Sequence, residues 1–222
     1  MTTSRLSIRS DYARTTTVDF PNPTSILTQL LGVNDSGEAA GYWQNAGGTQ
    51  FPFTVTAGGI FTPLDSLLRA NTMAQATDVN NAGEVPGFFV DGTGTHGFLL
   101  NGTTETTLNF PGSIFTQALG LNNMGEVVGD YVDGAGNMHG FIYNGTFQEV
   151  DDPSAPTTGT TINGINDKGQ IVGFFLTGVT TPDGVMMTDG FVGTPVPKPG
   201  SLMLLGAALA GAALIVRKRR AH

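Results

Sequence analysis

The stretch ALGLNNMGEVVGDY (residues 118–131) decides the fold, because its pattern occurs four times along the chain. The other copies read LLGVNDSGEAAGYW (30–43), ATDVNNAGEVPGFF (76–89) and INGINDKGQIVGFF (162–175). Each copy has an asparagine, here called the anchor, and a glycine three residues later, and successive anchors are 46, 42 and 44 residues apart. Internal repeats with a period of about 20–50 residues indicate propellers, solenoids or arrays. The anchors and their glycines are Asn34 and Gly37, Asn80 and Gly83, Asn122 and Gly125, and Asn166 and Gly169.

Each repeat is expected to form four short antiparallel strands. An apolar strand precedes the anchor, and the Asn-Asn or Asn-Asp pair followed by glycine predicts a tight turn, since these residues tolerate positive φ. A second strand follows the turn, and a third is expected in QFPFTV (50–55), THGFLL (95–100), MHGFIY (138–143) and TDGFVG (188–193). A fourth strand closes three of the units, in GIFTPLD (59–65), ETTLNFPGS (105–113) and FQEVDDPSA (147–155). Four strands in about 43 residues are the content of a propeller blade.

The two ends of the repeat region predict how the repeats close on one another. The fourth repeat stops after its third strand, near residue 192, and TTTVDFPNP (15–23) matches the closing segments of the other repeats. We therefore expect an all-β, propeller-like ring of four four-stranded repeats over residues 15–195, closed by the N-terminal strand, after a disordered N-terminus over 1–14. An open array, a β-solenoid and a truncated larger ring are the alternatives. Pairing of residues 17–20 with the first repeat instead of the last would make the closure prediction wrong.

The composition limits the classes of partner and chemistry. The chain has 222 residues, 39% of them apolar and 13% charged, and its 32 glycines and 12 prolines exclude a long helical bundle. It has no cysteine, which excludes disulfides, thiol catalysis and CxxC zinc sites. The net charge is −8, but five of the ten basic residues follow residue 195, so residues 1–195 have a net charge of −13. A region with this much negative charge repels nucleic-acid backbones, and we expect no nucleic-acid partner.

The C-terminal tail has the layout of a membrane anchor. Residues 201–216 contain no charged side chain, and such a run can cross a thin bilayer as a helix when its basic end snorkels. We therefore expect a proline-rich linker over 196–200 and a transmembrane helix with a basic cytoplasmic end over 201–222, which places the repeats outside the cytoplasm. The residues that define the helix are Ser201, Leu205, Gly206, Gly211 and Val216, and those that set its topology are Arg217, Lys218, Arg219 and Arg220.

Two resemblances to known families follow from these segments. The repeated anchor turn and the His/Asp-Gly-Phe segments that begin at residues 96, 139 and 189 resemble the HAF-repeat family of bacterial extracellular proteins, although the first repeat reads Pro-Phe in that place. The tail resembles a PEP-CTERM sorting signal, with Lys198 where that family usually has glutamate. The second resemblance implies an exosortase, which is a membrane protease, as a partner, and cleavage near residues 197–200. The matching motif is Val196, Pro197, Lys198, Pro199, Gly200 and Ser201.

The resemblances together imply a location. They imply a protein of the cell envelope that is held transiently in the inner membrane and then reaches the cell surface or the extracellular matrix. Residues 1–17 lack the apolar region of a signal peptide, which conflicts with export. We expect that an upstream segment with the export signal is missing from this chain. The alternative is a chain that is never exported and whose tail is a relic.

Few residues form a pattern that points to ligand chemistry. His96 and His139 occupy the same repeat position, but a metal needs three or four converging ligands, and a structural role at the start of a strand is favoured. The oxygen-rich anchor turns could hold calcium, although turn geometry alone explains their asparagines. The aromatic residues of the second strands could form sugar-stacking pockets or pack between repeats, and packing is favoured. The candidates to face a ligand are Trp43, Tyr42, His96 and His139, and we expect no metal or other cofactor.

The sequence favours a structural role over catalysis. It has no nucleophile elbow, P-loop, HExxH or GxGxxG motif, so we do not expect an enzyme. The main prediction is an exported surface or matrix repeat protein, sorted through its tail, with a scaffold or interaction role. The alternative is a lectin-like module for extracellular polysaccharide. A glycan hydrolase with a pair of carboxylates is the least favoured interpretation.

Overall fold

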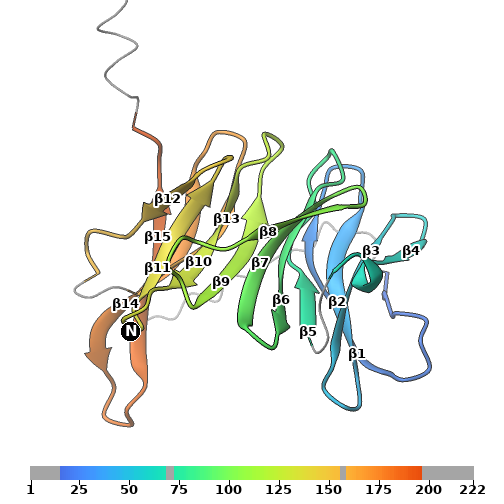
Figure 1. The fold of residues 1–222 in the computed structure, drawn as a ribbon, viewed down its shortest axis with the longest axis horizontal. Coiled ribbons are helices and arrows are strands. Elements are labelled where there is room, and N and C mark those ends of the chain that lie inside the picture. The colour runs from blue at the N-terminus through green and yellow to red at the C-terminus, as the bar shows by residue number, and fades with distance from the viewer. Residues whose placement is uncertain (1–15, 69–72, 156–158, 197–222) are drawn as a thin grey trace, which may run out of the picture. The chain divides into compact units, whose positions relative to one another are not determined.

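A computed structural model describes residues 16–68, 73–155 and 159–196. These residues form strands and one short 3-10 turn, η1 (Asp65–Leu67), so the all-β prediction is confirmed. Figure 1 shows the repeats in chain order, with the strands of the first repeat at one side and those of the fourth at the other.

The first repeat contains β1 (Ser25–Val33), β2 (Ala39–Asn45), β3 (Gln50–Val55) and β4 (Phe61–Pro63), and the second contains β5 (Met73–Ala76), β6 (Val85–Asp91), β7 (Gly94–Asn101) and β8 (Thr104–Leu108). The third contains β9 (Phe115–Leu121), β10 (Val127–Val132), β11 (Met138–Tyr143) and β12 (Phe147–Val150), and the fourth contains β13 (Thr160–Ile165), β14 (Ile171–Thr180) and β15 (Met186–Gly193).

Each repeat is an antiparallel sheet whose strands pair in chain order. In the third repeat, β9 pairs with β10, β10 with β11 and β11 with β12, and the first two repeats follow the same scheme. Short parallel bridges join consecutive repeats, with Gln50 beside Met73 and Thr95 beside Phe115. The fourth repeat is a separate sheet in the order β13-β14-β15, without a fourth strand among the described residues. The fourth repeat thus has three strands up to residue 196, and the prediction that no fourth strand follows concerns residues outside the described ranges.

The anchor turns are tight turns closed by glycine. In the second repeat, the N–H of Gly83 donates to the carbonyl oxygen of Asn80 at 3.0 Å, and the N–H of Asn80 donates to the carbonyl oxygen of Glu84 at 3.1 Å. The side-chain oxygen of Asn80 accepts two further bonds, from the N–H groups of Ala82 and Glu84. Gly83 has a φ of 78°, where a Cβ strains the backbone. The corresponding glycines have similar φ values, 78° at Gly37, 77° at Gly125 and 71° at Gly169.

A second glycine of the repeat lies where two strands approach closely. A Cβ at Gly129 would lie 1.9 Å from the backbone oxygen of Gln117, so no side chain fits there. The register between β9 and β10 shifts beside this glycine, as at a β-bulge. The equivalent Cβ–oxygen distance is 2.0 Å in each of the other repeats, at Gly41, Gly87 and Gly173.

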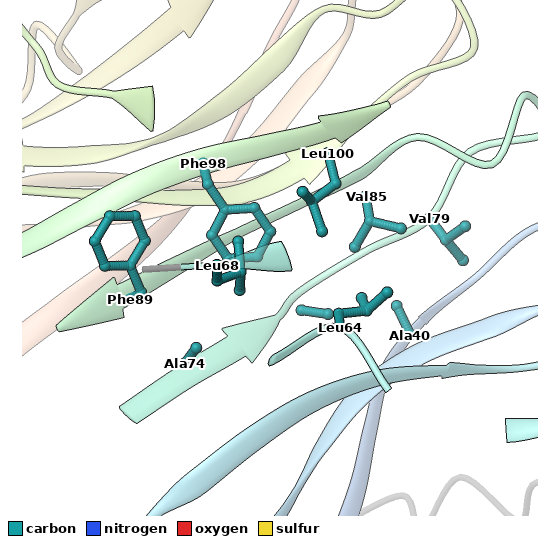
Figure 2. Close-up of a cluster of buried hydrophobic side chains, with 10 residues drawn as sticks. Ala40, Leu64, Leu68, Ala74, Val79, Val85, Phe89, Phe98 and Leu100 are labelled. Carbon is teal, nitrogen blue, oxygen red and sulfur yellow. The ribbon is translucent and has the colours of Figure 1, made fainter. Parts of the chain in front are cut away.

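The hydrophobic core lies between consecutive repeats as well as within them. Figure 2 shows one cluster, in which Ala40 from β2 of the first repeat packs with side chains of the second repeat. Ala40, Ala76 and Phe98 in this cluster are fully buried. Burial of apolar surface at each junction holds neighbouring repeats together, as in other repeat arrays. The members of the cluster are Ala40, Leu64, Leu68, Ala74, Ala76, Val79, Val85, Phe89, Phe98 and Leu100.

The N-terminal segment packs against the first repeat, so the prediction that it completes the fourth repeat and closes a ring is wrong for this structure. Phe20 stacks on Trp43 with ring centroids 5.2 Å apart, and its N–H donates to Thr28 Oγ1 at 3.0 Å. Phe110 stacks in the same way on Tyr131 of the third repeat. Phe20 thus holds the position in the first repeat that Phe110, in the connection from the second repeat, holds in the third. This placement partly buries Phe20 against apolar rings, whereas the fourth repeat lies on the other side of the array (Figure 1).

Several predictions concern residues outside the described ranges. The disordered N-terminus over 1–14 is one, and the transmembrane helix and most of the sorting motif, from residue 197 onward, are the others. Within the part of the chain that the structure describes, no helix is long and apolar enough to span a membrane. Export, anchoring and sorting therefore stay predictions.

Candidate functional site

The structure buries three of the four residues that were candidates to face a ligand, Tyr42, Trp43 and His139. Tyr42 is 8% exposed and Trp43 is 7% exposed, so the expectation that they face a ligand is wrong. Trp43 lies against the rings of Phe20 and Phe51, with centroid distances of 5.2 and 4.3 Å. The hydroxyl group of Tyr42 donates to Gln29 Oε1 at 2.6 Å. Both residues therefore pack in the core, which is the role that the aromatic pattern favoured.

His96 lies beside a groove where the second repeat meets the third. Its Nε2 atom is 2.8 Å from Thr93 Oγ1 and 3.2 Å from Asp91 Oδ1, and its Nδ1 atom is 3.0 Å from Asn109 Oδ1. The hydroxyl of Thr93 also donates to Asp91. This bond is the largest of the effects that lower the pKa of Asp91 to about 2, so the carboxyl group is ionised at neutral pH. The site thus brings an imidazole, an amide, a hydroxyl and a carboxylate together.

The groove beside His96 has a mixed polar and apolar lining. Its volume is about 250 Å³, which suits a ligand group of one ring better than a whole drug-sized molecule. Ile114 in its wall is 63% exposed, so apolar surface faces the solvent there. Among the described residues, the lining includes no acidic side chain. The lining residues are Thr93, Thr95, His96, Asn109, Ser113, Ile114 and Phe115.

His139 occupies the same position in the third repeat but is enclosed. Its Nδ1 atom is 2.7 Å from Asp151 Oδ2, its Nε2 atom is 3.7 Å from Asp133, and its ring stacks on Tyr131 with centroids 5.0 Å apart. Burial by itself lowers the pKa of His139, but the hydrogen bond to Asp151 and the nearby charges of Asp151, Glu149 and Asp133 outweigh it and raise the pKa above its usual value. This histidine is therefore a member of a packed, paired cluster and does not face a ligand.

The cluster around His139 has the residue types of a metal site. Among the described residues, His139, Glu149 and Asp151 form the group whose ligand atoms lie close enough to hold an ion, within 4.8 Å of one another. Those atoms already have partners, since Asp151 pairs with the imidazole and Glu149 accepts the hydroxyl of Tyr131. We therefore assign the cluster a structural role that ties β10, β11 and β12 together. The expectation of no metal stays a prediction.

The four anchor turns line a common cavity of about 230 Å³ and are linked by hydrogen bonds. Each of the first three anchors donates its side-chain amide to the backbone oxygen of the next anchor, from Asn34 to Asn80 at 3.0 Å, from Asn80 to Asn122 at 3.2 Å and from Asn122 to Asn166 at 3.2 Å. We call this row the anchor ladder. The residues after the anchors form a parallel row of bonds between side chains and N–H groups. These bonds use the oxygen atoms that calcium would need, which favours a structural role for the turns.

Sequence reasoning found His96 but missed its partners. Asp91 is five residues away and Asn109 is 13 residues away, and the pairing of β6 with β7 and of β7 with β8 brings all three together. One signal was available, because Asn109 and Asp151 occupy the same position of the closing segment and each contacts the histidine of its repeat. Ser113 and Ile114 follow in the connection to the third repeat and had no such signal.

The comparisons with known proteins give a distant likeness in structure. No family model matches the chain, and no curated protein is similar to it at a significant level. Among solved structures, the chain is similar to a mutant of the Aleuria aurantia lectin AAL in complex with Fucα1-6GlcNAc, with 13% sequence identity and a TM-score of 0.42. The match covers 78% of this chain and 67% of that chain. The HAF-repeat and PEP-CTERM resemblances stay predictions.

Proposed function

We propose that this protein binds carbohydrate and that the groove beside His96 holds one sugar ring. The observation that carries the proposal is the combination, in one groove, of imidazole, amide and hydroxyl groups with an exposed apolar wall. A sugar ring offers the matching combination, because its hydroxyl groups both donate and accept hydrogen bonds while its C–H faces are apolar. Binding sites for small molecules combine apolar surface with a few well-placed polar groups in the same way.

The polar side chains of the groove have complementary hydrogen-bonding capacities. The amide of Asn109 accepts at the oxygen that lies beside His96, and its two N–H donors can turn to a ligand hydroxyl group. Thr93 and Ser113 add hydroxyl groups, which donate or accept as the ligand requires. Ile114 and Phe115 supply the apolar surface for the face of the ring. Together they support recognition of a ring with several hydroxyl groups.

The charges around the groove favour a neutral sugar. The ionised Asp91 lies next to His96, and residues 1–195 have a net charge of −13, so the field of the protein opposes anionic ligands. Hydrolysis of a glycan needs two carboxyl groups about 5–10 Å apart across the bond. The lining of this groove, in the residues that the structure describes, supplies none, which supports binding without cleavage.

Titration calorimetry of the full chain against a panel of neutral mono- and disaccharides tests the proposal. We expect at least one sugar to bind with a Kd of about 0.1–10 mM, as suits a site for a single ring. Asn109→Ala should weaken that binding by about tenfold, since it removes amide donors to a ligand hydroxyl group, and His96→Ala should do the same, since it removes the imidazole that orients Asn109 and Thr93. Gln148→Ala, an exposed substitution on β12, is the matched control and should change nothing. Binding by no sugar, or equal binding by all three variants, overturns the proposal.

The proposed location rests on residues 196–222 and on their resemblance to a sorting signal. We infer export, a transient membrane anchor and processing by an exosortase-type protease. The intact mass of the protein from cells and from medium of its native host tests this. A species that ends near residues 197–200 outside the inner membrane supports sorting, and a full-length cytosolic species overturns it.

A scaffold role in the extracellular matrix is the second candidate function. The exposed faces at the two ends of the array favour it, because they offer surfaces on which an assembly can form.

A further inference from the structure

The fourth repeat presents a face that is buried in every other repeat. The position six residues after the anchor lies on the second strand of each repeat. Ala40, Pro86 and Val128 hold this position in the first three repeats and are buried, whereas Val172 in the fourth is 48% exposed. The difference arises because a following repeat covers this strand at the three inner junctions, whereas no repeat among the described residues covers it in the fourth.

The first repeat has exposed apolar side chains at the matching contact position on β1, the strand before its anchor. The position four residues before the anchor holds Ala76, Ala118 and Ile162 in repeats two to four, and all three side chains are 0% exposed. Leu30 holds it in the first repeat and is 39% exposed, and Val33, just before the anchor, is 65% exposed. Large exposed apolar side chains on this strand mark a surface on which another repeat can pack.

These two positions contact each other at the junctions inside the chain. Val128 of the third repeat packs in one cluster with Ile162 of the fourth, and Ala40 of the first packs with Ala76 of the second. In each of these pairs, the residue six positions after one anchor contacts the residue four positions before the next anchor. Val172 would therefore contact a residue at the position of Leu30 in a following repeat. The fourth and first repeats therefore hold the two halves of one further junction.

The anchor ladder is also open at its two ends. At an inner rung, the backbone oxygen of Asn122 accepts one bond from its own turn and one from the preceding anchor. In the described residues, the backbone oxygen of Asn34 accepts the bond from Gly37 and none from an anchor. Asn166 donates its amide to Gln170 instead of to a following anchor. One more rung, from Asn166 to an Asn34 oxygen, would complete the pattern.

The outer edge of the fourth repeat lacks a described partner strand, and residues 16–18 beside the first repeat match such a strand in sequence. The third strand of each of the first three repeats pairs with a fourth strand, but β15 has none within the described ranges. Residues 16–18 read Thr-Thr-Val and match Thr-Thr-Leu at the end of β8. Val18 packs on the core of the first repeat, as Leu108 of β8 packs on that of the third. The segment thus lies where the fourth strand of a preceding repeat would lie.

We propose that a second copy of this chain docks head to tail, with the fourth repeat of one molecule packed against the first repeat of the next. In this junction Val172 contacts Leu30, the anchor ladder gains a rung, and residues 16–18 pair with β15. Although the anchor turns of the first and fourth repeats line one cavity, β1 and β14 lie at opposite sides of the array and Leu30 and Val172 are both exposed, so the partner is a second copy (Figure 1). Such a heterologous junction builds a closed ring or a filament, according to the rotation per repeat. The proposal does not depend on carbohydrate binding.

A groove on the first repeat gives the docking surface room for incoming side chains. It has a volume of about 390 Å³ and lies between residues 16–19 and the strands of the first repeat. Its lining includes the apolar side chains of Val18, Leu30 and Val55. Three threonine hydroxyl groups and the carboxylate of Asp19 also line it, so the groove can receive both apolar and hydrogen-bonding groups of an incoming strand.

One polar contact of the junction differs from those inside the chain. In the row beside the anchor ladder, the successive partners are Asp35 with Asn81, Asn81 with Asn123, and Asn123 with Asp167. Between copies, the partners are Asp167 and Asp35, two carboxylates that repel each other. Asp35→Asn would create an amide–carboxylate pair like that of Asn81 Nδ2 with Asp35 Oδ2 at 2.6 Å. This substitution is therefore expected to strengthen association several-fold.

Native mass spectrometry and size-exclusion chromatography of the full chain in one mild detergent, over a concentration series, test the proposal. The wild type should associate as concentration rises. Leu30→Asp and Val172→Asp should each weaken association by more than about tenfold, because each places a charge in the apolar contact. Val185→Asp is the matched control, since Val185 is 63% exposed and lies in the turn between β14 and β15. It should associate as the wild type does.

Mixing the two disruptive variants separates this junction from other modes of association. Leu30→Asp keeps an intact fourth-repeat face and Val172→Asp keeps an intact first-repeat face. An equimolar mixture should therefore form one-to-one dimers although neither variant associates alone. Aggregation through the apolar tail or a symmetric dimer would show no such complementation. A wild type that stays monomeric, mixtures that do not dimerise, or an Asp35→Asn variant that associates more weakly than the wild type overturns the proposal.

Discussion

The side-chain amide of Asn80 donates a hydrogen bond to the backbone oxygen of Asn122, 42 residues later, at 3.2 Å. The same asparagine holds its own turn, because its side-chain oxygen accepts two backbone N–H groups. One side chain thus shapes a turn and also links that turn to the next repeat. In repeat arrays, stability depends on such nearest-neighbour contacts as well as on each repeat by itself.

The first prediction concerns the donor half of this role. Asn122→Asp keeps the oxygen that holds the turn but replaces the N–H donor that faces Asn166 and Glu126 with a carboxylate oxygen. It should lower the free energy of unfolding by about 2–4 kcal/mol, since buried acceptors would then face one another. Asn166→Asp is the control at the end of the ladder, where the amide of Gln170 can turn to donate. Urea denaturation of both variants checks this, and equal losses would contradict a linking role for the ladder.

The second prediction isolates the backbone strain at the anchor glycine. Gly83 has a φ of 78° and no atom within 4 Å of an added Cβ, so Gly83→Ala changes the strain without a clash. It should lower the free energy of unfolding by about 1–2 kcal/mol. Gly92→Ala in the same repeat also meets open space but has no positive φ, and it should be nearly neutral. Thermal denaturation of the two variants side by side is the measurement, and similar melting temperatures would refute the prediction.

The third prediction tests the close approach of two strands. Gly129→Ala would place its Cβ 1.9 Å from the backbone oxygen of Gln117, so β9 and β10 would have to move apart. We expect a loss of about 3 kcal/mol or more, or failure to fold. Gly134→Ala, which meets open space in the next turn, is the control and should fold normally. Soluble yield and circular dichroism report the outcome, and a stable, well-folded Gly129→Ala protein would show that the strands can separate at little cost.

The fourth prediction concerns the dependence of stability on pH. Asp130 is 3% exposed, its Oδ1 atom has no hydrogen-bond partner among the described residues, and burial raises its pKa from 3.8 to about 7. The folded protein therefore keeps a proton that the unfolded chain releases, and stability should fall as pH rises from about 4 to about 7. Asp130→Asn removes this loss and should be the more stable protein by about 2–4 kcal/mol near pH 8, with little difference near pH 4.

Urea denaturation of the wild type and of Asp130→Asn at both pH values tests this prediction. The difference between the two proteins cancels the titration of all other groups. A difference that does not vary with pH would mean that Asp130 is hydrated or paired in solution. The residue that holds the same position in the first repeat is Tyr42, whose hydroxyl group finds a partner in Gln29.

Much of the local structure could be predicted from the sequence. The anchor turns and the order of the strands depend on residues that are close together in the chain. The candidate site could be predicted only in part. His96 was found because it recurs, but Asp91 and Asn109 reach it through strand pairing, and the burial of Trp43 depends on Phe20, which is 23 residues away.

The sequence by itself determined the all-β repeat, because turn chemistry and apolar spacing act within a few residues and recur in each copy. Only the tertiary structure decided which histidine lines a groove and which is enclosed in a packed cluster. His96 and His139 have the same local sequence position, but Asn109 faces one and Asp151 the other, and the surrounding contacts differ. It also decided that Phe20 packs on the first repeat, since the burial of an aromatic ring depends on which surface comes within reach when the chain folds.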